Sequence, residues 1–493
     1  RNPGWPFRRR RGIGRGGGVP GDTGCLVRKR NQHPGRRRAN PMSLMDIRNM
    51  IHGQLQPPAS GQFIDNVNPG TGEVYSRVPD SGTDDVDAAV DSAQQALAAW
   101  AGKSAGERAT VMRRIADLVD QNRDRLVQAE TDDNGKPLML ARSVDIPRVS
   151  TNLRFFAGMM EGFASESHAM PGAINYTLRN PVGVVSCISP WNLPLYLLTW
   201  KIAPALATGN CVIAKPSEIT PMTAYLFSEL CIEAGLPPGV LNIVHGSGGT
   251  TGNAILTHPG ISAISFTGGT ATGEHIARTV APLFKKLSLE LGGKNPNIIF
   301  ADCNYKRMMQ TTLLSSFSNQ GQICLCGSRV LVERPIYDQF VDDFVQRASA
   351  MRVGDPYDSK NDLGAVVSGP HQQKILGCIE TARNEGGELL CGGGPAEVNG
   401  RCADGFFVEP TVFTGLGPES DTNQQEIFGP VVSIQPFDGE DHAVALANDS
   451  RYGLSATVWT ENIGRGHRMA ERIESGVVWV NCWLVRDLRT PFG

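Results

Sequence analysis

Glu290 and Cys324 are the residues best suited to chemistry by type and setting. A cysteine thiolate is a strong nucleophile that forms covalent intermediates, and a carboxylate can be the base that activates water. Glu290 stands between Leu289 and Leu291. A carboxylate in an apolar run needs a hydrogen-bond donor or a cation as its partner, or it has a functional role. A single cysteine is most often a small core residue. Spacing alone supports nucleophilic catalysis and a structural role equally.

A glycine-rich turn is a second candidate site. Residues 266–273 read FTGGTATG, with Gly268 and Gly273 where a strand is expected to give way to a helix. Backbone N–H groups at such a helix N-terminus can approach a pyrophosphate, as a dinucleotide requires. The glycine spacing differs from the common dinucleotide fingerprint, so a plain tight turn is an equally good interpretation.

Lys215 and Glu218 follow another expected strand, in the run AKPSE. A carboxylate in that place could accept hydrogen bonds from ribose hydroxyls. Taken alone, the pair is most often a solvated turn.

The elements that must position these residues form two α/β regions. From Gly183 onward, apolar runs alternate with helical patterns, which predicts a parallel, doubly wound, Rossmann-like sheet. Its expected strands are 183–188, 211–215, 240–246 and 261–266, with one helix ending at Gly209 and another beginning near Ala271. A second α/β region begins near Gly292, with strands expected at 295–300 and 329–333.

Two amphipathic helices are expected ahead of these regions. Thr83 is predicted as the N-cap of the first helix. Ser104 and Glu107 form a capping box at the start of the second.

The charge distribution separates an N-terminal tail from the rest. The net charge is −2, yet residues 1–41 carry twelve Arg or Lys and one acidic residue, Asp22, which leaves the remainder near −13. The tail lacks helical periodicity, so residues 1–48 are expected to be a disordered basic tail, with Met42 or Met45 as a plausible true start. An acidic body is a poor surface for a phosphate backbone, so no nucleic-acid partner is expected.

The cysteines, the histidines and one uncharged stretch argue against several other classes of protein. Eleven cysteines without framework spacing or a secretory signal indicate a reducing compartment, so a cytoplasmic location and no disulfides are expected. Residues 181–200 are uncharged, but Pro190 and Pro194 interrupt them, which favours a strand and a buried helix over a membrane span.

No H-E-x-x-H motif or ligand-spaced Cys/His pair occurs, so no metal is expected. A thiol hydrolase would need a histidine base, and the motifs described here contain none.

Taken together, these segments resemble the signature motifs of the aldehyde dehydrogenase superfamily. LELGGK is similar to its glutamate motif and FSNQGQICLCGSR to its cysteine motif, while PWNLP, AKPSE, FTGGTATG and EIFGP match other landmarks in order. The similarity runs from about Phe63 to Gly493. It implies an aldehyde dehydrogenase-like α/β fold and an NAD-dependent oxidoreductase that turns an aldehyde into an acid through a cysteine thioester. A catalytically silent binding or structural relative is disfavoured, because the motifs keep their chemical residues.

The resemblance also assigns roles residue by residue. Cys324 is the implied nucleophile, Glu290 the general base, and the Asn192 side chain with the Cys324 backbone N–H the oxyanion hole. The residues implied at the NAD site are Trp191, Lys215, Glu218, Gly248, Gly268, Gly273, Glu426 and Phe428. Gly269 stands where many relatives have serine, so one side-chain contact to the pyrophosphate is expected to be absent.

Within the superfamily, the sequence is most similar to the 2-aminomuconate semialdehyde dehydrogenases. The likeness lies in the stretches 146–148, 155–157, 189–216 and 481–486. Arg148 and Arg486 match residues that hold the substrate carboxylate there, which implies a carboxylated semialdehyde of tryptophan-type catabolism as substrate. The hydroxy form of that semialdehyde, or another aldehyde, is the alternative, and two solvated arginines are the ordinary structural interpretation.

The resemblance implies domains and assembly as well. Residues 49–170 and 184–291 are expected to form the NAD-binding domain, 171–183 part of an oligomerisation hairpin, and 292–493 the catalytic domain. Relatives continue past the position of Gly493 with a strand that joins a neighbouring subunit, so a homodimer or homotetramer is expected of a full-length chain.

Overall fold

The computed structural model describes residues 44–492, and its first large sheet carries the predicted Rossmann-like strands. Seven strands lie in the order β12-β11-β8-β9-β10-β2-β3, and the five from β12 to β10 are parallel. Their bounds are β2 Asn49–Ile51, β3 Gln54–Gln56, β8 Val184–Ile188, β9 Cys211–Lys215, β10 Leu241–Ile243, β11 Ala263–Thr267 and β12 Lys286–Glu290. The central strands β8 and β9 are buried along their whole length, as expected of a sheet covered on both faces.

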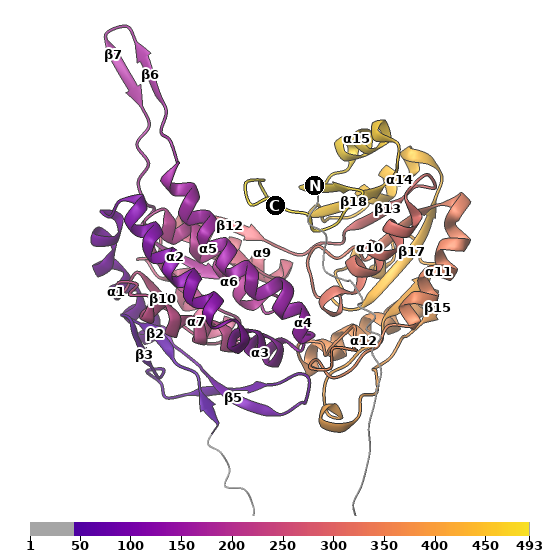
Figure 1. Cartoon of the computed structure of the whole chain (residues 1–493), viewed down its shortest axis with the longest axis horizontal. Coiled ribbons are helices and arrows are strands. Elements are labelled where there is room, and N and C mark those ends of the chain that lie inside the picture. The colour runs from indigo at the N-terminus through magenta and orange to yellow at the C-terminus, as the bar shows by residue number, and fades with distance from the viewer. Residues whose placement is uncertain (1–43, 493) are drawn as a thin grey trace, which may run out of the picture. The chain divides into compact units, whose positions relative to one another are not determined.

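Helices pack on this sheet and on one another. The helices α1, α6 and α7 contact its strands, and α2 and α5 pack together and against α6 (Figure 1). The helix bounds are α1 Thr83–Ala101, α2 Ala105–Gln121, α3 Arg123–Asn134, α4 Leu138–Leu140, α5 Ile146–Glu161, α6 Pro194–Ala207, α7 Met222–Glu233, α8 Asn253–Thr257 and α9 Thr270–Val280, with a π-helix at Ala141–Asp145.

The two predicted caps differ in outcome. Ser104 and Glu107 form the predicted capping box at α2. The predicted N-cap Thr83 is wrong by one residue, because Gly82 is the cap and Thr83 is the first helical residue. The Asp85 carboxylate accepts a hydrogen bond from the Gly82 N–H at 3.2 Å, so an acidic side chain of the first turn takes over part of the capping.

A second seven-stranded sheet follows, in the order β15-β16-β17-β14-β13-β18-β19, and only β15 is antiparallel. Its strands are β13 Pro296–Ile299, β14 Arg329–Glu333, β15 Glu388–Cys391, β16 Thr411–Thr414, β17 Val431–Phe437, β18 Ser455–Trp459 and β19 Val477–Val480. The helices of this half are α10 Tyr305–Phe317, α11 Tyr337–Ser349, α12 Gly369–Asn384, α13 Asp421–Gln424, α14 Gly439–Asn448 and α15 Ile463–Arg472.

Two smaller sheets complete the fold. One is a hairpin, β6 Ser167–Met170 with β7 Ala173–Tyr176, which projects beyond the end of α5 in Figure 1. The hairpin expected at 171–183 therefore begins before residue 171, since β6 forms its first strand. The other sheet has the order β1-β5-β4, with β1 Met45–Asp46, β4 Phe63–Val67 and β5 Val74–Pro79.

The tail expected at residues 1–48 is wrong at its C-terminal end, because residues 45–47 belong to the fold. Residues 1–43 lie outside the described part of the chain. Met45 and Asp46 pair with Ser76 and Arg77 of β5, and Ile47 is fully buried. A strand of two residues gives no periodicity by which sequence patterns could detect it.

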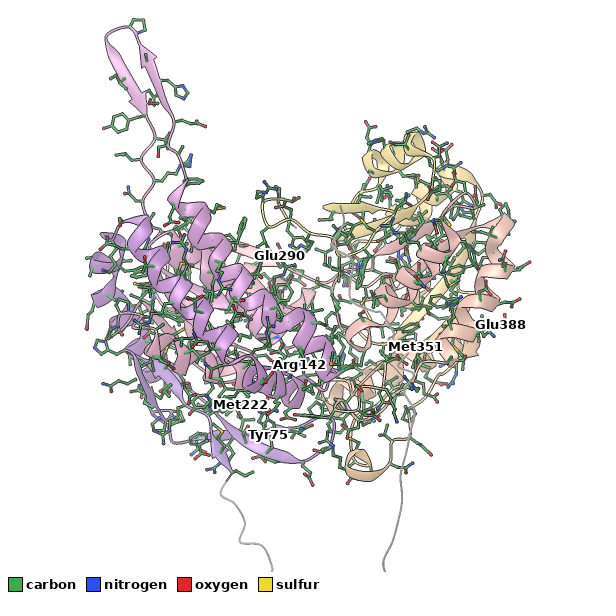
Figure 2. All side chains as sticks on the ribbon, in the orientation of Figure 1. Tyr75, Arg142, Met222, Glu290, Met351 and Glu388 are labelled. Carbon is green, nitrogen blue, oxygen red and sulfur yellow. The ribbon has the colours of Figure 1, made fainter. Side chains whose placement is uncertain are left out.

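Asp133 joins the small sheet to the helices. Its carboxylate accepts hydrogen bonds from the Tyr75 hydroxyl, from Asn66 Nδ2 at 2.7 Å and from the Met222 backbone N–H at 2.6 Å. Tyr75 and Met222 are marked in Figure 2. One buried side chain thus ties β4 and β5 to the ends of α3 and α7.

The sequence also suggested a strand and a buried helix, rather than a membrane span, for residues 181–200. That stretch forms β8 and the first half of α6. Among residues 44–492, no helix has the length and apolar character needed to cross a membrane.

Candidate active site

A cavity of about 450 Å³ lies at the carboxyl edge of the first sheet. The strand order reverses between β8 and β11, and ligands of open α/β sheets bind at such a switch point. The lining comes from the segments that follow β8, β9, β10, β11 and β12, and from the second half of the chain. Its volume lies within the range of about 300–1,000 Å³ that is usual for ligand sites. The predicted site residues that line it are Trp191, Asn192, Lys215, Glu218, Gly248, Gly268, Cys324, Glu426 and Phe428.

Lys215 and Glu218 form an ion pair at one end of this cavity. Lys215 Nζ lies 3.3 Å from Glu218 Oε2, and Glu218 Oε1 accepts a hydrogen bond from the Gly248 N–H at 3.3 Å. Burial acts to raise the pKa of Glu218, but the Lys215 charge and backbone N–H groups outweigh it and hold that pKa below its ordinary value. The carboxylate is therefore ionised at neutral pH and fixed in place.

The glycine-rich turn begins α9 as predicted, within one residue. Gly269 is the N-cap, and no side chain caps the helix, so its first N–H groups keep their capacity to bind an anion. Gly273 lies inside α9 and does not line the cavity. A Cβ there would come within 2.4 Å of the Leu291 side chain, so Gly273 permits close packing of α9 on the segment after β12.

Glu290 ends β12, where the chain leaves the first sheet for β13 of the second (Figure 2). Its backbone carbonyl accepts a hydrogen bond from the Gly268 N–H at 3.0 Å, which fixes the end of the strand beside the glycine turn. Burial raises the pKa of the Glu290 carboxyl, and the charges of Lys201 and Arg486 oppose that rise. A carboxylate with a raised pKa is a better base than an exposed one.

Cys324 lies in a loop between α10 and β14 that has unusual backbone geometry. Asn319, Gln320 and Gly321 all have positive φ, of 53°, 57° and 72°. Asn295 Nδ2 donates a hydrogen bond to the backbone carbonyl oxygen of Cys324 at 2.7 Å. Burial, and after it the carboxylates Glu426 and Glu290, raises the pKa of the Cys324 thiol to about 12, while Arg486 opposes this. At neutral pH the resting residue is a thiol, so attack must be coupled to loss of its proton.

Trp191, Phe428 and His371 form an aromatic wall of the cavity. The Trp191 ring meets the Phe428 ring edge to face, with centroids 5.2 Å apart, and the His371 ring at 4.9 Å. His371 Nε2 donates to the Phe428 carbonyl at 2.8 Å, and Phe428 has a positive φ of 62°. Burial lowers the pKa of His371 to about 4, so the imidazole is neutral.

Glu426 reaches into the same cavity from the segment before β17. Its Oε1 accepts a hydrogen bond from the Gly293 N–H at 3.0 Å. Burial raises the pKa of the Glu426 carboxyl, and the Gly293 N–H opposes the rise. A Cβ on Gly292 would lie 2.2 Å from Glu426 Oε2, so this close approach depends on glycine.

Asn192 lies where the two halves of the molecule meet, and its side chain is 2% exposed. Its Nδ2 donates to the Gln322 carbonyl at 2.9 Å, close to Cys324 in the chain. Its own carbonyl accepts from Asn319 Nδ2 at 3.0 Å and from Lys136 Nζ at 3.1 Å. The side-chain amide and the backbone carbonyl of Asn192 are thus both held by hydrogen bonds, with partners in both halves of the molecule, close to Cys324 in the chain.

Arg148 and Arg486 lie near each other without an acidic partner. Arg148 stacks on the Tyr196 ring at 5.5 Å, and Arg486 lies over the rings of Trp200 at 5.0 Å and Phe492 at 3.9 Å. Burial lowers the pKa of the Arg486 guanidinium, and the Arg148 charge adds to this, while Tyr196, Cys324 and Glu290 oppose it. Within residues 44–492, neither guanidinium forms an ion pair with a carboxylate. Two partly buried cations without an ion-pair partner are suited to receive an anionic group.

Some residues of the site were not anticipated from the sequence. Lys201 in α6 donates to Ser265 Oγ at 3.1 Å, and burial lowers its pKa to about 8. A lysine inside the apolar run LYLLTWKIAPALA is a signal that could have found it. His371 and Lys374 line the cavity from α12, and no sequence signal marks them.

These residues can together attack a carbonyl carbon and release an acyl group. Cys324 supplies a sulfur nucleophile and Asn192 an amide donor for the negative charge that develops on oxygen. Glu290 supplies a base, and the paired arginines a cationic end. Among residues 44–492, no cluster of His, Cys, Asp and Glu could hold a metal ion.

Comparison with known proteins places this arrangement in a family. The model of the aldehyde dehydrogenase family matches residues 56–493. The chain is 49% identical to the 2-aminomuconic semialdehyde dehydrogenase of Bos taurus over 454 residues, which cover 91% of this chain and 93% of that one. It is 45% identical to the 2-hydroxymuconic semialdehyde dehydrogenase of Pseudomonas sp. (strain CF600), with 91% and 94% covered.

A solved structure agrees with the fold. The NAD+ complex of an aldehyde dehydrogenase from Bacillus cereus superposes with a TM-score of 0.88 at 38% identity, and covers 91% of each chain. The predicted α/β fold class and the predicted enzyme class, an aldehyde-oxidising oxidoreductase, are confirmed. The chain belongs to the aldehyde dehydrogenase family.

Proposed function

We propose that the protein oxidises a carboxylated semialdehyde, of the 2-aminomuconate 6-semialdehyde type, to the corresponding dicarboxylic acid with NAD as the hydride acceptor. The observation that carries the substrate class is the pair Arg148 and Arg486, two stacked guanidiniums without a carboxylate partner in the described chain. The names of the bovine and Pseudomonas relatives point to the same class of substrate.

The cavity fits a dinucleotide. A Cβ on Gly248 or on Gly269 would meet nothing within 4 Å, so the backbone at these positions is open to the cavity. The uncapped N-terminus of α9 suits a pyrophosphate, and the fixed Glu218 carboxylate suits ribose hydroxyls. Bound NAD supplies an acceptor for the hydride that leaves the substrate carbon. Gly273 contributes only through the packing of α9.

The chain's own residues account for the remaining chemistry. The Cys324 thiol gives its proton to solvent water as its sulfur forms a bond to the aldehyde carbon, and the carbonyl oxygen becomes an alkoxide. Asn192 Nδ2 and the Cys324 backbone N–H are the proposed donors to that oxygen. Loss of the hydride leaves a thioester on Cys324. Glu290 then takes a proton from water, which attacks the thioester carbon and returns the thiol.

Glu426, Phe428 and Trp191 form the other end of the proposed cofactor site. Glu426 is anchored by the Gly293 N–H, and Phe428 by its edge-to-face contact with Trp191. A buried acidic side chain and a fixed aromatic wall suit a ribose and a planar ring. These assignments place the acceptor end of the cofactor beside Cys324.

The experiment that tests the proposal is a comparison of two aldehydes matched in chain length. The full chain is assayed with NAD on 6-oxohexanoate and on hexanal. The distal carboxylate should raise kcat/KM by about ten- to a hundred-fold, since a charge-assisted hydrogen bond contributes about 1.5–3 kcal/mol. Equal kcat/KM values for the two aldehydes would indicate a dehydrogenase for another class of aldehyde, and absence of turnover on a wide panel would indicate a silent relative.

We further propose a homodimer or homotetramer that works in the cytoplasm. The β6–β7 hairpin and the segment directly after it expose Met170, Ile174, Tyr176 and Leu178, whose exposed fractions are 54%, 74%, 62% and 73%. Apolar side chains gathered on a projecting hairpin support burial against another subunit. A catalytic thiol favours a reducing compartment. Sedimentation of the protein tests the assembly, and a monomer would contradict it.

A further inference from the structure

A fully buried cluster of three ionisable side chains lies next to the backbone carbonyl of Asn192. Lys136 follows the glycine that ends α3, and it is 0% exposed, as are Glu130 and Asp145. Lys136 Nζ lies 3.2 Å from Asp145 Oδ1 and 3.6 Å from Glu130 Oε1. The third neighbour of the ammonium is the Asn192 carbonyl, at 3.1 Å. Two carboxyl groups at ion-pair distance and one hydrogen-bonded backbone carbonyl, from three separate segments, thus surround one ammonium.

Burial of this cluster costs free energy, and the net charge of its three side chains is close to zero. Burial raises the pKa of Glu130 to about 8 and raises that of Asp145. One carboxyl therefore keeps its proton at neutral pH, and the other balances the Lys136 charge. Buried ion clusters seldom add stability over apolar residues of the same size, so the retention of this one calls for another reason.

The position of Asn192 supplies that reason. The residue lies between β8 and α6, outside both elements, so neither a strand nor a helix fixes its peptide. Its carbonyl oxygen accepts from Lys136 Nζ and also from Asn319 Nδ2 at 3.0 Å and Asn134 Nδ2 at 3.3 Å. These bonds set the orientation of the peptide, and hence the direction in which the side-chain amide projects.

We propose that Lys136, balanced by Glu130 and Asp145, is a positioning residue that fixes the Asn192 peptide so that its amide points at the oxygen of the substrate carbon bonded to Cys324. The inference rests on the proposed function, because it assumes that Asn192 stabilises the alkoxide. Lys136 itself touches neither substrate nor cofactor and acts only through Asn192.

A variant that keeps the cluster neutral provides the test. Lys136→Met alone leaves two buried carboxyls and could fail to fold, so it is combined with Asp145→Asn, which leaves protonated Glu130 as the remaining acid. Arg108→Met is the matched control. Arg108 is also a buried cation that donates to a backbone carbonyl, that of Ala207 at 3.0 Å, but at the far end of α6.

Two reactions report on the amide. One is NAD-dependent oxidation of 6-oxohexanoate, and the other is hydrolysis of p-nitrophenyl acetate, in which Cys324 attacks an ester without any hydride transfer. The double variant should lose about ten- to a hundred-fold in kcat for both, as expected for a misplaced catalytic group. The Kd for NAD and the rate of Cys324 alkylation by iodoacetamide should stay unchanged. Arg108→Met should lower the melting temperature and leave kcat unchanged.

A double-mutant cycle separates positioning from general stability. Asn192→Ala alone should lower kcat by about 10²–10³-fold, as loss of an oxyanion donor does. Adding the Lys136 and Asp145 changes to Asn192→Ala should then cause no further loss, because no amide remains to be positioned. A full additional loss in that background overturns the inference, and so does an unchanged kcat in the double variant. If the native chain hydrolyses the ester with the same dependence on Lys136 but oxidises no aldehyde, the proposed function fails and the positioning role stands.

Discussion

The two halves of the molecule have the same kind of sheet but present opposite edges of it to the site. In the first half, Asn192, Lys215, Gly268 and Glu290 end or follow parallel strands. In the second half, the nucleophile and two proposed cofactor residues precede strands: Cys324 comes before β14, and Glu426 and Phe428 come before β17, whereas Arg486 follows β19. The carboxyl edge of one sheet thus lies across the cavity from the amino edge of the other.

This difference limits the general rule that α/β sites lie at carboxyl ends of strands. The rule predicts the position of the proposed cofactor residues in the first half, where backbone N–H groups and side chains at strand ends converge. It does not locate the nucleophile, which lies in a loop with three successive left-handed residues. Side-chain amides such as those of Asn295 and Asn319 replace regular structure there. The first half therefore forms its part of the site from the ends of parallel strands. The second half places the nucleophile in a loop that is held by local side-chain hydrogen bonds.

The largest expected effect concerns the nucleophile of the second half. Cys324→Ser should abolish aldehyde oxidation, since a serine in this environment has no comparable nucleophilicity at neutral pH. Cys326→Ala is the matched control, because Cys326 is a buried neighbour in the same loop and should be dispensable. Steady turnover by the serine variant, measured as NADH formation, would move the nucleophile elsewhere.

The next effect tests the base contributed by the first half. Glu290→Gln should leave formation of the thioester largely intact and slow its hydrolysis by about 10²–10⁴-fold, the usual contribution of a general base. The acyl-enzyme should then accumulate and be visible by mass spectrometry. In the native chain, hydrolysis should speed up as the pH rises through the raised pKa of Glu290, because only the ionised carboxylate accepts a proton. A rate of hydrolysis that is flat across that range counts against this role.

A smaller effect concerns the arginine pair, to which each half contributes one residue. Arg148→Ala and Arg486→Ala should each lower kcat/KM on 6-oxohexanoate by about ten- to a hundred-fold and change it little on hexanal. Equal losses on both aldehydes would make the arginines structural, and the proposed substrate class would have to be withdrawn.

The smallest effect concerns the choice of cofactor at the carboxyl edge of β9. The ionised Glu218 should disfavour the 2′-phosphate of NADP, so the chain should prefer NAD. Glu218→Gln should bring the kcat/KM values for NAD and NADP closer together, because the amide has no negative charge and can still accept a hydrogen bond from Lys215 Nζ. Equal or better efficiency of the native chain with NADP would contradict this.

Sequence patterns predicted the central strands well, because long apolar runs flanked by glycine turns leave few alternatives. The strands expected at 211–215 and 329–333 coincide with β9 and β14. The strands β1 to β3 were missed, since each has two or three residues and is held only by its neighbours. Signature motifs pointed to the candidate residues, whereas Lys136, Lys201 and His371 are brought to the site by tertiary packing. Their contacts arise between segments distant in sequence, which local patterns do not encode.

The buried carboxyl of Asp133 has a consequence for how the folded protein responds to acid. Burial raises its pKa from 3.8 to about 7, although Tyr75, Asn66 and the Met222 N–H oppose the rise. Between those two values the native chain holds a proton that the unfolded chain has released, so the free energy of unfolding falls as the pH rises across that window. Glu130, with a pKa raised to about 8, acts in the same direction. Asp133→Asn should therefore weaken the fall in melting temperature between about pH 5 and neutrality, whereas the lowered pKa of His371 acts in the opposite direction below about pH 6.5 and is left in place by this variant.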